Sequence, residues 1–218
     1  MSLPNGVLAL DVPQGSAEWL AAKCGVLSGS RALAVVTQGK GSAPSAMRET
    51  LKMQLVLEYI TRKYQGGFIV TDPMQAGTDR EPLAFARHEA ETGECLTRSG
   101  WLYRTDARVG CSLDAYIGDY DSLVSIKCRQ PKAHYEAIKG GAIDKGARVQ
   151  MIHELWITGA QSHSYVSFNP DFPKGLQYHC VTVPRDEAEI AAYATEATKF
   201  LAEVQTEIDT MQTLGGQR

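Results

Sequence analysis

Asp114 and Lys127 are the residues of this chain whose types and spacing best suit hydrolytic chemistry. Asp114 lies in an apolar segment, residues 108–116, and Lys127 lies in a second one, residues 123–128. Each segment has the length and composition of a β-strand. Between them, Gly118–Asp121 has the residue types of a turn. The pattern therefore predicts a β-hairpin that places Asp114 beside Lys127.

The second strand adds two further groups to this pair. Because side chains alternate along a strand, Ser125 and Lys127 face one side while Ile126 faces the core. Asp114 can hold Mg²⁺, which prefers oxygen ligands, and the backbone carbonyl of Ile126 can serve as a further ligand. A lysine can orient or deprotonate the attacking water. The set is suited to hydrolysis of a phosphodiester.

The order of the surrounding motifs decides the interpretation, because a lone Asp and Lys on neighbouring strands is more often a solvated surface pair. In chain order the motifs are Trp19-x-x-x-Lys23-x-Gly25-Val26-x-Ser28-x-Ser30, Gly77-Thr78-Asp79-Arg80-Glu81, Cys111-Ser112-Leu113-Asp114, Ser125-Ile126-Lys127-Cys128, Gln150, and Leu155-Trp156-Ile157-Thr158. This succession resembles the phage lambda exonuclease and YqaJ-type viral recombinase family of the PD-(D/E)XK nuclease superfamily. The resemblance covers residues from about 14 to 158, in the same order and with similar gaps.

The resemblance implies roles for the residues that match the family's motifs. Asp114 matches the metal-binding aspartate, Lys127 the catalytic lysine and Glu81 a helical glutamate that faces the same site. Gln150 matches the first glutamine of the family's Gln-x-Gln segment, whereas Ile152 stands in place of the second.

A second site is implied near the N-terminus. Lys23 stands where the family carries an arginine suited to gripping the 5′-phosphate of a DNA end, and Ser28 and Ser30 can add hydroxyl donors. Lysine keeps the charge and loses the bidentate fork, so we expect a looser grip than arginine gives.

Ser125 departs from the family, which has an acidic residue at this position and so reads E-x-K where this chain reads S-x-K. Three explanations are open. The glutamate has migrated, with Glu154 as the candidate because it lies one helical turn after Gln150. Alternatively, Glu81 carries more of the metal binding, or the site is disabled. Because Asp114, Lys127 and Glu81 are all present, we favour a working enzyme.

The resemblance also implies an activity. The family expectation is a Mg²⁺-dependent exonuclease, with Mn²⁺ as a possible substitute, that degrades linear double-stranded DNA 5′ to 3′ into mononucleotides. It leaves a 3′ single strand for annealing-type recombination. The implied partners are double-stranded DNA ends, a single-strand annealing protein and two further copies of the chain in a ring-shaped homotrimer.

Two other functions remain possible at this stage. The first is a non-catalytic DNA-end-binding protein that has lost its metal site through Ser125, which addition of Mg²⁺ or Mn²⁺ to a linear duplex would reveal. The second is a sequence-specific endonuclease of the same superfamily, which would cut a closed circular plasmid.

Composition constrains the class of protein only weakly. The chain has 218 residues and a net charge of -3, so any DNA-binding field must be local to a cleft. No stretch of about 20 apolar residues suggests a membrane span. The resemblance implies a cytoplasmic protein of a bacterial host, encoded by a phage or prophage. The cysteines have no metal-ligand spacing and are expected to be buried, reduced thiols.

The periodicity of the rest of the chain predicts an α/β (α+β) fold, in which helices flank a central mixed β-sheet. The resemblance implies a restriction-endonuclease-like PD-(D/E)XK core, in one domain over residues 1–218. Helices are expected at about 47–60, 73–92, 132–139 and 145–156, with a long last helix whose apolar stripe includes residues 190–208. Further strands are expected at 101–104, 163–168 and 176–183.

Several side chains have a structural explanation that competes with a functional one. Trp19 and Trp156 are expected to be core aromatic residues, and His88 and His153 to be satisfied helical histidines. For the basic run 129–134, which includes His134, a solvated loop and a contact with the DNA backbone are equally open. The last helix is most simply a packed amphipathic helix, with a subunit contact as the alternative.

Overall fold

The structure is a computed structural model that describes residues 3–4, 6–41, 43–66, 72–141 and 143–216, without the side chains of residues 72–78. The helices are α1 (Ala17–Lys23), α2 (Ala32–Val36), α3 (Ala46–Thr61), α4 (Asp72–Thr92), α5 (Pro131–Ile138), α6 (Lys145–Thr158) and α7 (Glu187–Gly216), with 3-10 turns η1 (Gly29–Arg31) and η2 (Lys174–Leu176). The strands are β1 (Val7–Leu10), β2 (Leu27–Ser28), β3 (Trp101–Arg104), β4 (Val109–Ser112), β5 (Ala115–Ile117), β6 (Ser122–Cys128), β7 (Ser162–Phe168) and β8 (Tyr178–Pro184).

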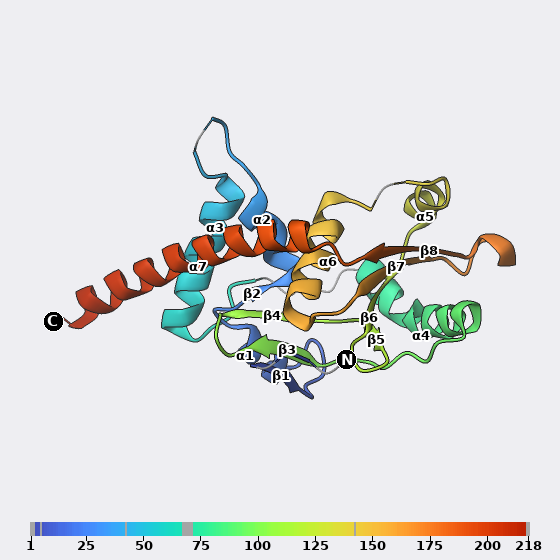
Figure 1. Cartoon of the computed structure of the whole chain (residues 1–218), viewed down its shortest axis with the longest axis horizontal. Helices are drawn as coiled ribbons and strands as arrows, with labels where there is room; N and C mark the ends of the chain where they lie inside the picture. The colour runs from blue at the N-terminus through green and yellow to red at the C-terminus, as the bar shows by residue number, and fades with distance from the viewer. Residues whose placement is uncertain (1–2, 5, 42, 67–71, 142, 217–218) are drawn as a thin grey trace.

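The strands form two four-stranded mixed sheets (Figure 1). The N-terminal sheet has the order β1-β3-β4-β2, with β2 parallel to β4 and the other pairs antiparallel. The C-terminal sheet has the order β5-β6-β7-β8, with β6 parallel to β7 between two antiparallel pairs. The predicted central mixed sheet is therefore present as two sheets, and helices flank both.

The two faces of the C-terminal sheet are covered by different helices. Ala84 and Phe85 of α4 pack with Val124, Ile126 and neighbouring residues on one face. Residues of α5 and α6 cover the other face, which carries the alternate side chains of β6. Helix α6 also contacts β3, β4 and η1, so it joins the two sheets (Figure 1).

Helix α7 supplies much of the main core. Its apolar stripe, predicted from the sequence, is buried at Ile190, Tyr193, Ala197, Phe200, Val204 and Ile208. The helix runs beside α3, and its C-terminal end projects beyond the rest of the molecule (Figure 1). A two-pronged ion pair fixes the two helices, because Arg48 Nη1 and Nη2 donate to Glu203 Oε2 and Oε1 at 2.6 and 2.9 Å.

The structure corrects three sequence-based expectations about the elements. The segment 108–116 is two strands in different sheets, because the chain turns at Leu113–Asp114 between β4 and β5. Helical spacing puts Met47 and Ile60 on the same face of α3 as the buried Leu51 and Leu55, but both are exposed. No element was predicted over β1 and α1; Ser16 caps α1 by accepting a hydrogen bond from Trp19 N.

Two findings bear on the expected class of protein. No helix within the described residues is both long and apolar enough to cross a membrane. All the cysteines are free thiols, but Cys111 is the one that is fully buried and Cys95 is exposed, so burial was expected too broadly.

Candidate active site

Asp114 lies where the chain leaves the N-terminal sheet and enters the C-terminal one. Its Oδ2 accepts a hydrogen bond from the backbone N of Ile126 at 2.8 Å and lies 3.3 Å from Lys127 Nζ. The antiparallel pairing of Ala115 with Val124 creates this proximity, as the predicted hairpin requires. About a quarter of the Asp114 side chain is exposed (24%), so the carboxylate is accessible from solvent.

Beyond Val124, strand β6 has no strand partner on the side of β5, because β5 pairs only with residues 122–124. The amide N–H of Ile126 points toward this open edge, where Asp114 accepts it. In a β-strand the N–H and C=O of one residue point to the same side. The carbonyl of Ile126 therefore also faces the open edge, beside the Asp114 carboxylate.

Lys127 is held as an ammonium in this setting. The Asp114 carboxylate is the main cause that raises the pKa of Lys127, burial lowers it, and Glu154 raises it further. Because the side chain is about one third exposed (37%), the ion pair itself adds little to stability. The ion pair instead determines geometry, because it holds Lys127 Nζ next to the Asp114 carboxylate.

Ser125 lies on the same face of β6 as Lys127, and it is buried (4% exposed). Glu154 of α6 faces the same side of the sheet, because it bonds His163 of β7, a residue paired in register with Leu123. Both oxygens of Glu154 are engaged: Oε1 accepts from Gln150 Nε2 at 2.8 Å, and Oε2 lies 2.7 Å from His163 Nε2. In this state Glu154 orients the Gln150 amide.

Glu81 of α4 lies over the opposite face of the sheet from Ser125, close enough to raise the pKa of Cys128 through its charge. Its Oε1 accepts from Arg98 Nη1 at 2.7 Å. Arg98 is largely exposed, so this ion pair is weak and solvent can replace it. The structure thus brings Asp114 and Lys127 into contact, whereas the Glu81 carboxylate is paired with Arg98 instead.

The donor set at the open edge fits one hard divalent cation. Asp114 and the Ile126 carbonyl offer two adjacent oxygen donors, and Mg²⁺ is usually held by one or two carboxylates while it keeps several waters. Among the residues that the structure describes, no group of three or more His, Cys, Asp and Glu side chains is placed to hold a metal. This arrangement fits one ion better than two.

Lys23, the last residue of α1, lies among aromatic side chains, and this cluster is the Lys23 pocket. Its Nζ is 3.8 Å from the ring centre of Trp19, 5.5 Å from that of Tyr64 and 5.9 Å from that of Trp101. The residue is buried (6% exposed), and burial is the main cause that lowers its pKa to about 8, with the Arg31 charge second and Glu58 acting in the opposite direction. Such an ammonium lacks water and is suited to receive an anion.

The turn that carries Ser28 and Ser30 packs directly on α6. Ser28 is buried and Ser30 is exposed, and their hydroxyl oxygens are 3.3 Å apart. Gly29 between them packs closely against α6, since a Cβ there would lie 3.1 Å from Gln150 Cγ and 3.2 Å from Glu154 Oε1. The serine turn therefore contacts Gln150 and Glu154 of α6.

Sequence reasoning missed several residues of the pocket around Lys23. Ser112 Oγ accepts a hydrogen bond from Trp19 Nε1 at 2.7 Å, which ties α1 to β4 two residues before Asp114. Glu58, which is completely buried, binds Arg31 from α3. The signal for Glu58 was present in the sequence, because a charged residue occupies an i+7 position in the apolar stripe that begins at Leu51.

The remaining aromatic and basic residues divide into structural and exposed groups. His153 is buried with both ring nitrogens hydrogen-bonded, as expected for a structural histidine. His88 is also buried and its Nδ1 lies 2.8 Å from the Tyr178 hydroxyl, but its Nε2 has no hydrogen-bond partner among the described residues, so it is not fully satisfied. Trp19 is buried and Trp156 half-buried.

A DNA contact by His134 is ruled out by its position. The ring is fully buried, with Nδ1 2.8 Å from Ser167 Oγ and Nε2 2.7 Å from the carbonyl oxygen of Leu176. In the same run, Arg129 bonds the Tyr165 hydroxyl and lies 3.7 Å from Asp144. Lys132 is exposed, so it is the basic residue of this run that is most open to solvent.

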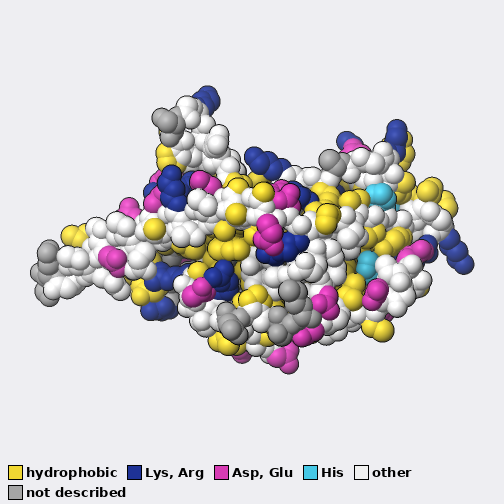
Figure 2. All heavy atoms as spheres, in the orientation of Figure 1, with side chains coloured by type: hydrophobic (Ala, Val, Ile, Leu, Met, Phe, Trp, Pro, Cys, Tyr) yellow, Lys and Arg dark blue, Asp and Glu magenta, His cyan; other side chains and the backbone are white. Residues whose placement is uncertain are grey.

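The surface charge is mixed. On the face drawn in Figure 2, basic and acidic side chains are interspersed and no patch of a single sign covers it. With a net charge of -3, any attraction for a polyanion has to come from a local concentration of positive charge.

Comparison with known proteins gives consistent results for fold and family. The profile of the YqaJ-like viral recombinase domain matches residues 18–161. The alkaline exonuclease LHK-Exo from Laribacter hongkongensis is 33% identical and superposes with a TM-score of 0.82, over 93% of this chain and 99% of that chain. Its complex with dAMP matches over the same shares with 34% identity and the same TM-score.

A phage-related exonuclease from Haemophilus somnus 129PT is 13% identical, with a TM-score of 0.67 over 85% of this chain and 96% of that chain, and it shows the shared fold alone. No curated protein sequence matches the chain. Because the recombinase profile covers well over half of the sequence and LHK-Exo matches nearly all of it, the chain belongs to the YqaJ-like viral recombinase family and has the PD-(D/E)XK-type fold of the alkaline exonucleases.

Proposed function

We propose that this protein is a Mg²⁺-dependent exonuclease that degrades linear double-stranded DNA 5′ to 3′ into mononucleotides and leaves a 3′ single strand. The observation that carries the proposal is the Asp114 carboxylate at the open edge of β6, with the Ile126 amide and Lys127 Nζ bound to it. The direction of degradation is supported by the buried, cationic pocket at Lys23, which is suited to a terminal phosphate.

In this proposal Asp114 and the Ile126 carbonyl hold Mg²⁺, for which Mn²⁺ can substitute. When bound, the ion polarises the phosphodiester and stabilises the charge that develops on the leaving 3′-oxygen. Lys127 Nζ orients the attacking water from the position that Asp114 fixes. Gln150, held by Glu154, presents its amide toward the same face as Ser125 and Lys127. Glu81 joins the site once it releases Arg98.

Ser125 keeps two alternatives in consideration: a DNA-end-binding protein without catalysis, and an endonuclease of the same superfamily. The retained contact between Asp114 and Lys127 favours a working catalytic site over the binding protein. The 5′-phosphate pocket favours an enzyme that starts from an end over one that cuts within a duplex.

The activity is tested with three DNA substrates in Mg²⁺: a 5′-phosphorylated linear duplex, a 5′-hydroxyl linear duplex and a covalently closed circle. We expect release of mononucleotides from both linear forms, faster from the phosphorylated one, and an intact circle. Cleavage of the circle would identify an endonuclease. No cleavage of any substrate in Mg²⁺ or Mn²⁺ would leave DNA-end binding as the function.

Replacement of Asp114 by alanine removes the carboxylate that holds the metal and fixes Lys127. We expect nuclease activity to fall by about a thousandfold or more, since this single group serves both purposes. Release of acid-soluble nucleotides measures the effect, and circular dichroism checks the fold. Asp106→Ala, at an exposed aspartate paired with Arg104, is the control and should keep full activity. Near wild-type activity of Asp114→Ala would overturn the assignment of the site.

The preference for a 5′-phosphate should depend on pH through Lys23. Because burial lowers the pKa of this lysine to about 8, its ammonium is present below that pH and is lost as the pH rises through it. The ratio of duplex dissociation constants, 5′-hydroxyl to 5′-phosphate, should therefore be largest below pH 8 and then fall, at most about tenfold per pH unit.

Fluorescence anisotropy in Ca²⁺, which replaces the catalytic ion, measures this ratio between pH 6.5 and 9.5. The matched variant is Lys23→Arg, because a guanidinium stays protonated over this range and should give a flat ratio. A wild-type ratio as flat as that of Lys23→Arg would contradict this prediction.

For assembly we propose the family's homotrimer, a ring through which the duplex passes, with a single-strand annealing protein as the partner that receives the 3′ strand. We place this work in the cytoplasm of a bacterial host, as the product of a phage or prophage. Sedimentation equilibrium at micromolar concentration tests the ring directly: we expect three times the mass of the 23.8 kDa chain. A stable monomer would remove the ring from the proposal.

A further inference from the structure

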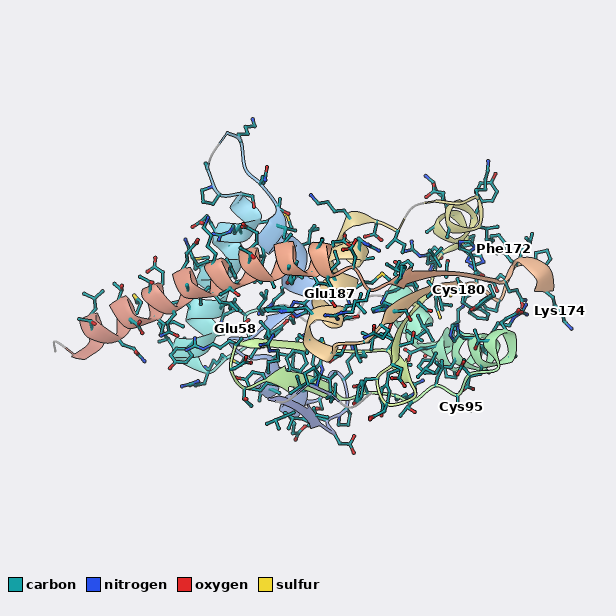
Figure 3. The ribbon with its side chains drawn as sticks, viewed as in Figure 1. Glu58, Cys95, Phe172, Lys174, Cys180 and Glu187 are labelled. Atoms are coloured by element: carbon teal, nitrogen blue, oxygen red, sulfur yellow. The ribbon has the colours of Figure 1, made fainter. Side chains whose placement is uncertain are left out.

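Glu58 is a buried carboxylate that the catalytic chemistry does not use. It lies near the C-terminal end of α3, as Figure 3 shows, and it is completely shielded from solvent. Four N–H donors reach its two oxygens. Oε2 accepts from Gly25 N at 2.8 Å and Arg31 Nη1 at 3.0 Å, and Oε1 accepts from Arg31 Nη2 at 2.5 Å and Gln65 N at 2.9 Å.

These donors come from three segments that surround the Lys23 pocket. Gly25 follows Lys23 by two residues and has φ +72°, a left-handed conformation in which its N–H points to Glu58. Arg31 directly follows Ser30 in η1, and Gln65 directly follows Tyr64. Glu58 thus holds together the end of α1, the serine turn and the segment after α3.

The charged groups around Glu58 include one more cation than carboxylates. The two-pronged pairing with Arg31 balances the Glu58 carboxylate, and Arg31 Cζ also lies 4.6 Å from the ring centre of Tyr64. Within the described part of the chain, no carboxylate forms an ion pair with Lys23, whose surroundings are the rings of Trp19, Tyr64 and Trp101. A buried site with this surplus charge favours an anionic ligand.

We propose that Glu58 is the positioning residue of the 5′-phosphate pocket. Through Gly25 it fixes the direction in which Lys23 leaves α1, and through Arg31 it fixes the turn that carries the Ser28 and Ser30 hydroxyls. The pocket is thereby set for a terminal phosphate before DNA arrives. This inference rests on the proposed function, because it assumes that Lys23 receives the 5′-phosphate.

Replacement of Glu58 by glutamine keeps the size of the side chain but removes the charge and turns one acceptor into a donor. The amide N–H₂ then faces either Gly25 N or Gln65 N, each of which is itself a donor. We expect the preference for a 5′-phosphorylated duplex end to fall about tenfold, in line with the loss of a buried hydrogen bond to a charged group. Cleavage of a 5′-hydroxyl duplex at saturating concentration should change less than about twofold.

The chain offers a matched control on the same helix. Arg48 of α3 and Glu203 of α7 form the same two-pronged arginine–glutamate pair, on a part of α3 that does not contact Lys23. Glu203→Gln therefore reports the cost of losing such a pair without disturbing the pocket. The measured quantity is the ratio of dissociation constants for 5′-hydroxyl and 5′-phosphorylated duplexes in Ca²⁺, for wild type, Glu58→Gln and Glu203→Gln.

A second readout separates positioning from a general loss of structure. The Glu58 charge helps to keep Lys23 protonated, so in Glu58→Gln the decline of the phosphate preference with pH should begin at a lower pH than in wild type. Glu203→Gln should leave this pH dependence unchanged. A purely structural defect would weaken binding of both duplexes equally at every pH.

Loss of the preference in Glu58→Gln alone, with the shifted pH dependence, supports the inference. A wild type that prefers the phosphate, together with a folded Glu58→Gln that keeps the same preference, overturns the inference and leaves the proposed function intact. If the wild type shows no preference for the 5′-phosphorylated duplex, the proposed phosphate pocket is itself rejected. If Glu58→Gln does not fold, Glu58→Asp and Arg31→Lys take its place. Each keeps the charge: the first shortens the carboxylate side chain, and the second replaces the two-pronged guanidinium by a single ammonium. An unchanged preference for the 5′-phosphate in both variants overturns the inference.

Discussion

The whole site depends on the place where one chain segment passes between two sheets. β4 ends at Ser112 and β5 begins at Ala115, so Asp114 stands in the gap, where its side chain rather than its backbone completes the edge of β6. A regular strand would place a backbone carbonyl opposite the Ile126 amide. Here a carboxylate takes that role, and the same oxygen then orients Lys127. The break between β4 and β5 thus fixes the position of the Asp114 carboxylate, and the β5–β6 hairpin that follows supplies Lys127.

Helix α6 connects this gap to the Lys23 pocket through direct contacts. Glu154 bonds Gln150 on its own helix and His163 on β7, and both Gln150 and Glu154 approach the bare Cα of Gly29. A Cβ at Gly29 would lie 3.1 Å from Gln150 Cγ and 3.2 Å from Glu154 Oε1, so a side chain there would require these side chains to shift by a few tenths of an ångström. In the proposed function, this close contact between η1 and α6 helps to fix the distance from a DNA end at Lys23 to the bond that is cleaved. Placement of this kind lets an enzyme hold a substrate in a reactive geometry.

The sequence predicted those parts that depend on periodicity, and it failed where tertiary contacts decide. The strand at Trp101–Arg104 and the stripe of α7 were read correctly because alternation and helical spacing are local signals. The turn at Leu113–Asp114 was missed because the apolar run continues through it, and only the second sheet separates the two halves. Glu58 was missed for a related reason: its place in the apolar stripe of α3 indicates burial, but the arginine that balances its charge lies 27 residues earlier, and no local pattern identifies that partner.

Lys23 and Lys127 differ in their counter-charges, and this difference bears on the proposed binding of DNA ends by an acidic protein. Lys127 is balanced by Asp114, which raises its pKa, so that half of the site is electrically complete without DNA. Lys23 is buried among aromatic rings, and burial is the main cause that lowers its pKa to about 8, with the Arg31 charge second and the Glu58 charge acting in the opposite direction. In the proposed function, a terminal phosphate supplies the counter-charge that Lys23 lacks. On this proposal, selection for DNA ends depends on one buried cation whose partner comes from the substrate, rather than on a basic surface.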